Sequence, residues 1–343
     1  MKKSGCALFG CLAVVGLLAL AALAFVRVLA PETAPMPSEE AETEPPEAEQ
    51  PLPQDPNSFQ LTFRFLDPEG RPRRFSCAIR RADYELEEAS FGYVDKDRIE
   101  ELNRGVREIL AKEAADRGVA GYFTIEVYDE GSIRWTWTYP GGTPPKTIER
   151  IEAFDAWLEN DSRAAIDALE ERYYHAHWMR LNDDEIAVDY ERFVREATEP
   201  LADCFKALQG LGRGRSGPSL DLFLTFIQDL RYELPQKVDQ EGRETLGFRV
   251  PTAVMVEGAG DCDSKSVVFC SLWRQLPGRV LLVLVPGHAL VAVEGKPGPG
   301  QASVRLGNRY YILCEVAGPG RFKPGETDVS GSFEYVLIEP VRG

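Results

Sequence analysis

A run of proline and acidic residues near the amino terminus limits how much of this chain can build a folded core. Residues 31–56 contain eight prolines, eight acidic residues and no lysine or arginine. Such a segment has few apolar side chains to bury and its like charges repel, so we expect a stiff, disordered linker. It carries half of the chain's net charge of −16, which leaves the rest only moderately acidic.

An uncharged apolar stretch, Gly5 to Val26, precedes this linker. A helix of that length crosses a hydrocarbon layer of about 30 Å. We predict a transmembrane helix at residues 5–30 and a cytoplasmic tip at residues 1–4, because Lys2 and Lys3 favour a cytoplasmic amino terminus. Everything after the anchor would then face the periplasmic, extracytoplasmic side of the cell membrane.

A cleaved signal peptide is the alternative for the same stretch, since residues 28–30 resemble a small-residue cleavage site. In either case the folded part would lie outside the cytoplasm. The sequence contains no basic stripe, so we do not expect it to bind nucleic acid.

Residues 57–142 alternate apolar and polar side chains in four short segments, as strands with one buried face do. Apolar residues at helical spacing lie between the second and third segments. We predict an accessory α+β domain of four antiparallel strands covered by one helix. Helical periodicity over residues 146–211 indicates a helical bridge to a last domain at residues 212–343. The strand positions are Phe59, Leu61, Phe63, Phe65, Phe75, Cys77, Ile79, Phe123, Ile125, Val127, Ile133, Trp135, Trp137 and Tyr139.

One cysteine of the last domain has neighbours that are unlike those of a core cysteine. Cys262 follows the glycine-rich segment Gly258 to Asp261 and precedes apolar residues at helical spacing. We expect it at a helix amino terminus, where unpaired backbone N–H groups stabilise a thiolate. Five cysteines follow the anchor, and this odd total and their wide spacing argue against a disulfide framework. The four besides Cys262 are predicted to be small core side chains: Cys77, Cys204, Cys270 and Cys314.

Two later passages supply a base and an acid for that thiol. Residues 279–285 and 288–293 have the composition of strands separated by a Pro-Gly turn, so His288 begins a strand. A third strand is expected over residues 309–316 and carries Glu315 near its end. If these strands are antiparallel neighbours packed on the cysteine-bearing helix, the three side chains converge. Covalent catalysis by a thiol needs such a base and a group that orients it.

These residues resemble the transglutaminase-like superfamily, in its bacterial cysteine-peptidase-like branch. The resemblance lies in Pro251-Thr252, Gly258 to Lys265, and the passages around His288 and Glu315, and covers roughly 140 residues, the size of one domain. It implies a papain-like α+β core in which the helix bearing the nucleophile Cys262 packs on an antiparallel sheet. His288 would be the base and Glu315 the orienting acid. The family usually has aspartate at this third position, and glutamate is one methylene longer.

The hypothesis that follows is a membrane-anchored thiol hydrolase, a peptidase or amidase, that forms a thioester with a protein or peptide substrate and needs no cofactor. Transfer of the acyl group to an amine is a second outcome of the same intermediate. The alternative from another class is a catalytically inactive envelope scaffold or binding module with the same fold.

The carboxylates of Asp261 and Asp263 present a difficulty for a thiolate, since like charges repel. They would cap the helix by accepting its first N–H groups. Alternatively they are two ligands of a Ca²⁺ ion, as the resemblance suggests, although calcium takes about six oxygens. The backbone N–H of Cys262 is a candidate oxyanion donor. Tyr232 is a candidate second donor, with packing in the core as its alternative.

Overall fold

The computed structural model describes residues 2–7, 55–128, 133–182, 185–212, 219–318, 320–327, 329 and 333–341. The predicted linker up to residue 54, and the predicted transmembrane helix apart from residues 5–7, lie outside this range. Residues 5–7 belong to strand β1 (Lys2–Ala7), which pairs with β5. Among the described residues, no helix combines the length and the apolar composition that a membrane span requires.

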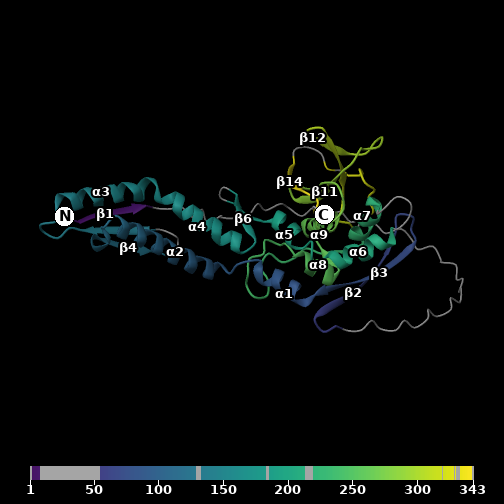
Figure 1. Cartoon of the computed structure of the whole chain (residues 1–343), viewed down its shortest axis with the longest axis horizontal. Helices are drawn as coiled ribbons and strands as arrows, with labels where there is room; N and C mark the ends of the chain where they lie inside the picture. Colours follow the sequence, from purple (N-terminus) through teal and green to yellow (C-terminus); the bar gives the residue numbers. More distant parts are fainter. Residues whose placement is uncertain are drawn as a thin grey trace, which may run out of the picture.

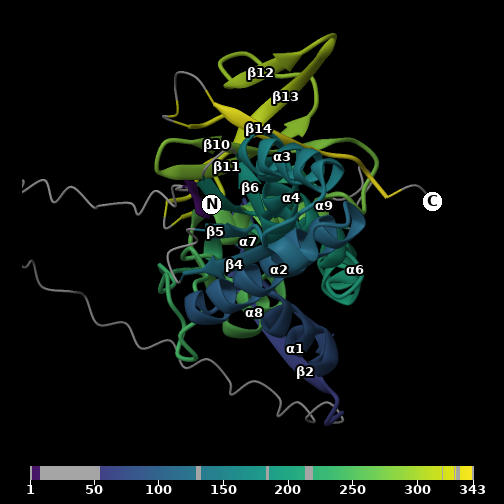
Figure 2. The same cartoon turned by 90° about the vertical axis from the view of Figure 1, so that its left-hand side faces the viewer.

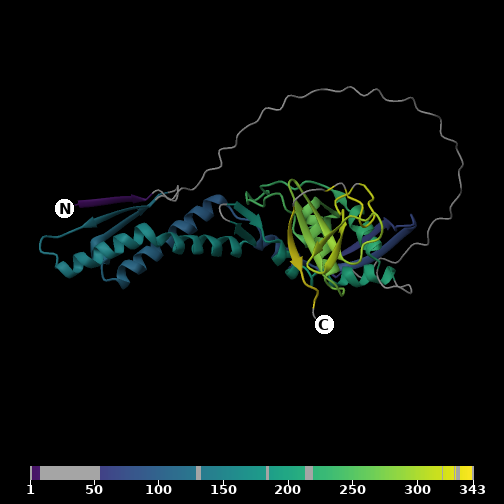
Figure 3. The ribbon, with the colours of Figure 1, turned by 90° about the horizontal axis from the view of Figure 1, so that it is seen from above.

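The chain folds as an α+β structure with an elongated arm and a wider body (Figure 1, Figure 3). The arm has a three-stranded sheet in the order β1-β5-β4. Its helices and strands after β1 follow one another in sequence: α2 (Asp95–Asp116), the short 3-10 helix η1 (Ala120–Tyr122), β4 (Phe123–Val127), β5 (Ile133–Thr138), α3 (Pro145–Asn160) and α4 (Ser162–Ala176).

The arm has a hydrophobic core of its own. Apolar side chains from α2, β5 and α3 meet there, with Trp137 and Phe154 almost completely buried. The indole N–H groups of Trp135 and Trp137 both donate to Asp155 Oδ1, at 2.9 and 2.8 Å. The Asp155 carboxylate on α3 therefore accepts a hydrogen bond from each buried indole N–H group. Because neither N–H group is left without an acceptor, both tryptophans can lie on the buried face of β5.

The body combines segments that are far apart in sequence, with its five-stranded sheet on one side and helices such as α7 and α8 on the other (Figure 2). The elements before the sheet are β2 (Ser58–Leu66), β3 (Pro72–Arg80), α1 (Arg81–Ser90), β6 (Met179–Asn182), β7 (Glu185–Val188), α5 (Tyr190–Glu196), α6 (Ala202–Leu211), α7 (Leu220–Asp229), β8 (Arg231–Tyr232), α8 (Pro251–Glu257), β9 (Ala259–Gly260) and α9 (Cys262–Trp273).

The sheet of the body is antiparallel, in the order β12-β13-β11-β10-β14. Helix α9 packs on β10 and β11, and α5, α7 and α8 pack around it. Every residue of α9 from Ser264 to Trp273 is buried, so this helix is the centre of the body. The predicted strands around His288 and before Glu315, and their antiparallel pairing, are confirmed. The strands are β10 (Val280–Val285), β11 (His288–Glu294), β12 (Ser303–Leu306), β13 (Arg309–Cys314) and β14 (Glu334–Ile338).

The four strands expected to share one accessory sheet lie in two separate sheets. The β2-β3 hairpin forms its own two-stranded sheet and packs on α6 and α7, in the body, whereas β4 and β5 lie in the arm. Phe63, Phe65 and Phe75 of the hairpin make edge contacts with Phe226 of α7. Alternation in a sequence predicts that a strand has one buried face, but it does not identify the element that covers that face.

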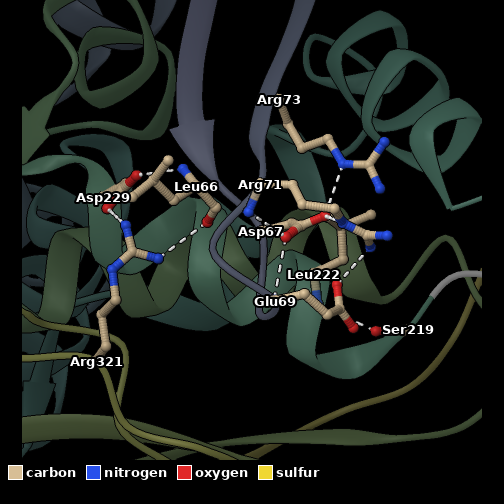
Figure 4. A network of polar contacts seen from close by, with 9 residues as sticks. All are labelled: Leu66, Asp67, Glu69, Arg71, Arg73, Ser219, Leu222, Asp229 and Arg321. Atoms are coloured by element: carbon tan, nitrogen blue, oxygen red, sulfur yellow. Dashed lines mark hydrogen bonds and ion pairs between the residues drawn. The ribbon is translucent and has the colours of Figure 1, made fainter.

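Polar contacts near the turn of the β2-β3 hairpin join it to neighbouring parts of the body (Figure 4). Asp229, at the end of α7, accepts a hydrogen bond from the Leu66 backbone N–H at 3.1 Å and pairs with Arg321, which also donates to Leu66 O at 2.9 Å. In the turn, the buried Asp67 carboxylate accepts from Arg71 and Arg73, each at 2.8 Å. The hairpin is thus held to α7 and to the segment that follows β13.

Cys77 and Cys204 form a disulfide, which corrects our prediction that both are unpaired core side chains. Their Cα atoms are 4.9 Å apart, within the usual range for a disulfide, and they join β3 to α6. The two residues are separated by 127 positions, so their proximity depends on long-range packing that spacing cannot reveal. Three other cysteines of the body, Cys262, Cys270 and Cys314, are free.

Candidate active site

The thiol of Cys262 lies where the buried central helix reaches the surface. Helix α8 ends at Gly258, whose φ of 65° is a left-handed conformation that glycine adopts without strain. Strand β9 follows, paired in parallel with β8, and Asp261 then begins α9 as its N-cap residue. Cys262 is the first residue of the helix, which confirms the predicted helix amino terminus, and it is partly exposed.

The aspartates beside the thiol cap the helix. The Ser264 backbone N–H donates to Asp261 Oδ1 at 3.3 Å and to Asp263 Oδ1 at 2.8 Å, and the Tyr190 hydroxyl donates to Asp263 Oδ2 at 2.7 Å. Burial, followed by contact with Asp261, raises the pKa of Asp263 to about 7. The pair therefore carries less than two full negative charges at neutral pH, which reduces the repulsion that a thiolate would meet.

The same contacts bear on the alternative role of Asp261 and Asp263 as calcium ligands. Over the ranges described, no cluster of three or more His, Cys, Asp or Glu side chains is arranged to hold a metal ion. The two aspartates interact with Ser264 and Tyr190.

His288 and Glu315 form a hydrogen-bonded pair beside Cys262. His288 Nε2 lies 2.6 Å from Glu315 Oε2, and Glu315 Oε1 accepts from the Ala317 backbone N–H at 2.9 Å. Because Nε2 is used in this way, Nδ1 is the ring nitrogen available to the sulfur. A hydrogen bond to Cys262, then the one to Glu315, outweigh burial and raise the pKa of His288 to about 10.

The sheet explains why these three residues meet. His288 is the first residue of β11 and pairs with Val285 across a two-residue turn, while Glu315 directly follows β13, the next strand. Because β11 and β13 are antiparallel, the start of one and the end of the other lie at the same end of the sheet, and helix α9 packs against β11. The Glu315 side chain is only 12% exposed, which distinguishes it from a solvated glutamate at a strand end.

Tyr232 lies at the rim of this group. Its residue is 42% exposed, so the alternative of packing in the core is wrong for it. It is aligned with Gly260 in the β8-β9 pair, two residues before the thiol. Partial burial and then the negative charge of Cys262 raise the pKa of Tyr232, which places its hydroxyl in the electrostatic field of the site.

Lys265 and Gln228 are buried polar residues to which we assigned no role from the sequence. The Lys265 ammonium group donates to the carbonyls of Leu230 and Ala317, and burial lowers the pKa of Lys265 to about 8. Gln228 Nε2 donates to Glu315 O at 2.7 Å and to Phe322 O at 2.9 Å. The sequence feature that could have pointed to a role for Lys265 is its position, because a lysine is rarely found within an apolar run such as the one that follows Cys262.

The other free thiols differ from Cys262 in their surroundings. Cys270 and Cys314 are completely buried, and burial raises the pKa of both. A cavity of about 300 Å³, lined in part by Val283, Leu313 and Phe333, lies across the sheet from α9 and does not include the three converging residues. Among the free cysteines from residue 55 onward whose burial is described, Cys262 is the one that solvent reaches.

Comparisons of the chain with protein-family models, with curated proteins and with solved structures give no match.

Proposed function

We propose that this protein is a membrane-anchored thiol hydrolase of the transglutaminase-like superfamily that cleaves amide bonds in protein or peptide substrates outside the cytoplasm. One observation carries the proposal. The partly exposed thiol of Cys262 begins a buried helix and lies beside the imidazole of His288, whose Nε2 is 2.6 Å from a carboxylate oxygen of Glu315. These are a nucleophile, a base and an orienting group within reach of one another.

In the proposed reaction, Cys262 Sγ attacks the carbonyl carbon of the substrate amide. The negative charge that develops on the carbonyl oxygen is stabilised by the Cys262 backbone N–H, with the Tyr232 hydroxyl as second donor. Imidazolium His288 protonates the leaving amine as the C–N bond breaks and a thioester forms. His288 then removes a proton from water, which attacks the thioester and releases the acid and the thiol. An amine in place of that water gives acyl transfer.

The fold supports the proposal at the level of architecture. A helix that carries the cysteine at its first turn and packs on an antiparallel sheet is the arrangement a papain-like core would have. The Cys77–Cys204 disulfide supports placement in an oxidising compartment. A predicted anchor and an acidic linker would hold the body away from the membrane surface.

The test is formation of an acyl-enzyme. The full chain is incubated with p-nitrophenyl acetate, and the acetylated residue is identified by mass spectrometry. We expect acetylation of Cys262 in the wild type and in Cys270→Ala, which removes a buried thiol as the matched control, and none in Cys262→Ala. His288→Asn is expected to lower the rate by about 10²–10⁴-fold, the usual contribution of a general base.

Two results would count against the hydrolase. Equal acetylation of the wild type and of Cys262→Ala would remove the nucleophile. Acetylation of Cys262 at a rate that His288→Asn leaves unchanged would favour the inactive scaffold, in which the three residues share a site without acting together.

A further inference from the structure

Lys265 occupies an unusual environment for a lysine. It lies one turn after Cys262 on α9, on the same face of the helix, and its side chain is completely buried. Its ammonium group is bonded to two neutral carbonyl oxygens, those of Leu230 and Ala317. A buried charge is costly unless it is well compensated, and an apolar side chain of similar volume is often as stable. Packing alone does not account for a lysine here.

The contact with Ala317 connects Lys265 to the acid of the candidate active site. Lys265 Nζ donates to Ala317 O at 2.7 Å, and the backbone N–H of the same Ala317 donates to Glu315 Oε1 at 2.9 Å. Glu315 Oε2 lies 2.6 Å from His288 Nε2, and His288 lies close enough to Cys262, the residue that begins the lysine's own helix, for the thiol to raise the pKa of the imidazole. The contacts thus form a closed ring that starts and ends on α9.

The segment after Glu315 is also held from α7. Gln228 is 5% exposed, and its Nε2 donates to the backbone carbonyl of Glu315 at 2.7 Å. Gly318 has a φ of 70°, and a Cβ atom there would lie 2.7 Å from Gln228 O and 3.7 Å from Lys265 Nζ. Arg321 pairs with Asp229 at the end of the same helix (Figure 4). Several bonds therefore seat this segment against α7 and α9.

We propose that Lys265 is a positioning residue of the candidate active site, which holds the backbone of Ala317 in place so that Glu315 orients His288 toward Cys262. This inference deepens the proposed function and rests on it. The lysine does not contact the reacting atoms. It acts through Ala317 and Glu315, with Gln228 as a second support for the same segment.

The experiment follows the protonation of His288, because that property depends on the hydrogen bond to Glu315 and does not depend on turnover. The chain has three histidines, so selective ¹³C labelling of histidine gives at most three ring signals, and His288→Gln identifies the signal of His288. The midpoint of its titration is measured in the full-length wild type, in Glu315→Gln and in Lys265→Met. Leu272→Ala is the matched control, since Leu272 is equally buried in the same helix.

We expect a high midpoint for His288 in the wild type and a large fall in Glu315→Gln. Lys265→Met should lower the midpoint by about one pH unit, the usual effect of weakening one charged neighbour. Leu272→Ala should destabilise the fold and leave the midpoint unchanged. A merely structural lysine would behave like Leu272, so a folded Lys265→Met with the wild-type midpoint would overturn the proposal.

If Lys265→Met does not fold, Lys265→Gln decides the question, because its shorter neutral side chain keeps a polar group in the buried site and removes the ammonium group that donates to Ala317 O. A lowered His288 midpoint there supports the proposal, and an unchanged midpoint overturns it. Failure of the proposed function would show differently. A wild type that forms no acyl-enzyme, but whose His288 midpoint still responds to Lys265→Met, retains the positioning role and loses the hydrolase.

Discussion

The arm and the body bury side chains of similar kinds but assemble them differently. The arm core draws its buried residues from positions 106–166, so its contacts are local in sequence. The main core of the body joins residues from Phe65 to Ile338, and the converging Cys262, His288 and Glu315 all belong to the body. Local patterns predicted the helices and strands of the arm from α2 to α4, although not β1, where a membrane anchor was predicted. The body and its site depend on long-range packing. We therefore expect a core mutation in one region to change the stability of that region and to leave the stability of the other unchanged.

The largest expected effect comes from two matched core truncations, Phe154→Ala in the arm and Phe223→Ala in the body. Both side chains are completely buried; Phe154 packs on Phe123 and Trp137, and Phe223 on Trp273 of α9. Each change should lower the free energy of unfolding of its own region by about 3–5 kcal/mol.

Alkylation of Cys270 in increasing denaturant reports unfolding of the body, because this thiol is buried in α9. We expect Phe223→Ala to shift the Cys270 midpoint to lower denaturant. Phe154→Ala should leave that midpoint in place while far-ultraviolet circular dichroism shows an earlier transition from the arm helices. A single coincident transition in both variants would mean that arm and body unfold as one unit.

Removal of the Cys77–Cys204 disulfide should act on the body alone. A cross-link that closes a loop of 127 residues restricts the unfolded chain strongly. We expect the double variant Cys77→Ala, Cys204→Ala to lose about 2–5 kcal/mol, measured by the same Cys270 midpoint. Cys314→Ala is the control, since it removes a buried thiol that is not cross-linked. An equal loss in the arm transition would contradict the separation.

The candidate site was predictable to the extent that it depends on short motifs. The glycine-rich turn before Cys262 predicted the helix start, and the Pro-Gly turn predicted the strand that begins with His288. The Cys77–Cys204 disulfide was missed because no local pattern brings β3 to α6. Lys265 received no role because its partners are backbone carbonyls, which every residue type supplies.

A smaller effect is expected at Glu87. This residue lies in α1, just before the arm, and its side chain contacts α8, the helix that precedes Cys262. Its Oε2 accepts from the backbone N–H and the hydroxyl of Thr252, at 2.9 and 2.7 Å, at the start of α8. Burial raises the pKa of Glu87 from 4.5 to about 7, and Oε1 is buried without a partner among the described atoms. The folded state therefore binds this proton more tightly than the unfolded state does.

Because the folded pKa of Glu87 is the higher one, its contribution is fully present below pH 4.5 and is lost as the pH rises to about 7. We expect the free energy of unfolding of the wild type to fall by about 2–3 kcal/mol more than that of Glu87→Gln across this range. Denaturant titrations at pH 4.5 and pH 8 measure the difference. Parallel pH profiles for the two proteins would show that folding leaves the pKa of Glu87 unchanged.

The smallest expected effect is at Tyr190, which begins α5 directly after the β6-β7 hairpin at the base of the arm. Its hydroxyl donates to Asp263 at 2.7 Å, and this bond favours the charged carboxylate. Tyr190→Phe should cost the body about 1 kcal/mol, the usual value of one hydrogen bond, read from the Cys270 midpoint. Tyr232→Phe is the matched control, because Tyr232 is exposed and should change stability little. With less of the Asp263 charge retained, Cys262 should react faster with iodoacetamide at neutral pH in Tyr190→Phe. A slower reaction would mean that Tyr190 holds the site in place, and that the negative charge of Asp263 does not limit the reaction rate of Cys262.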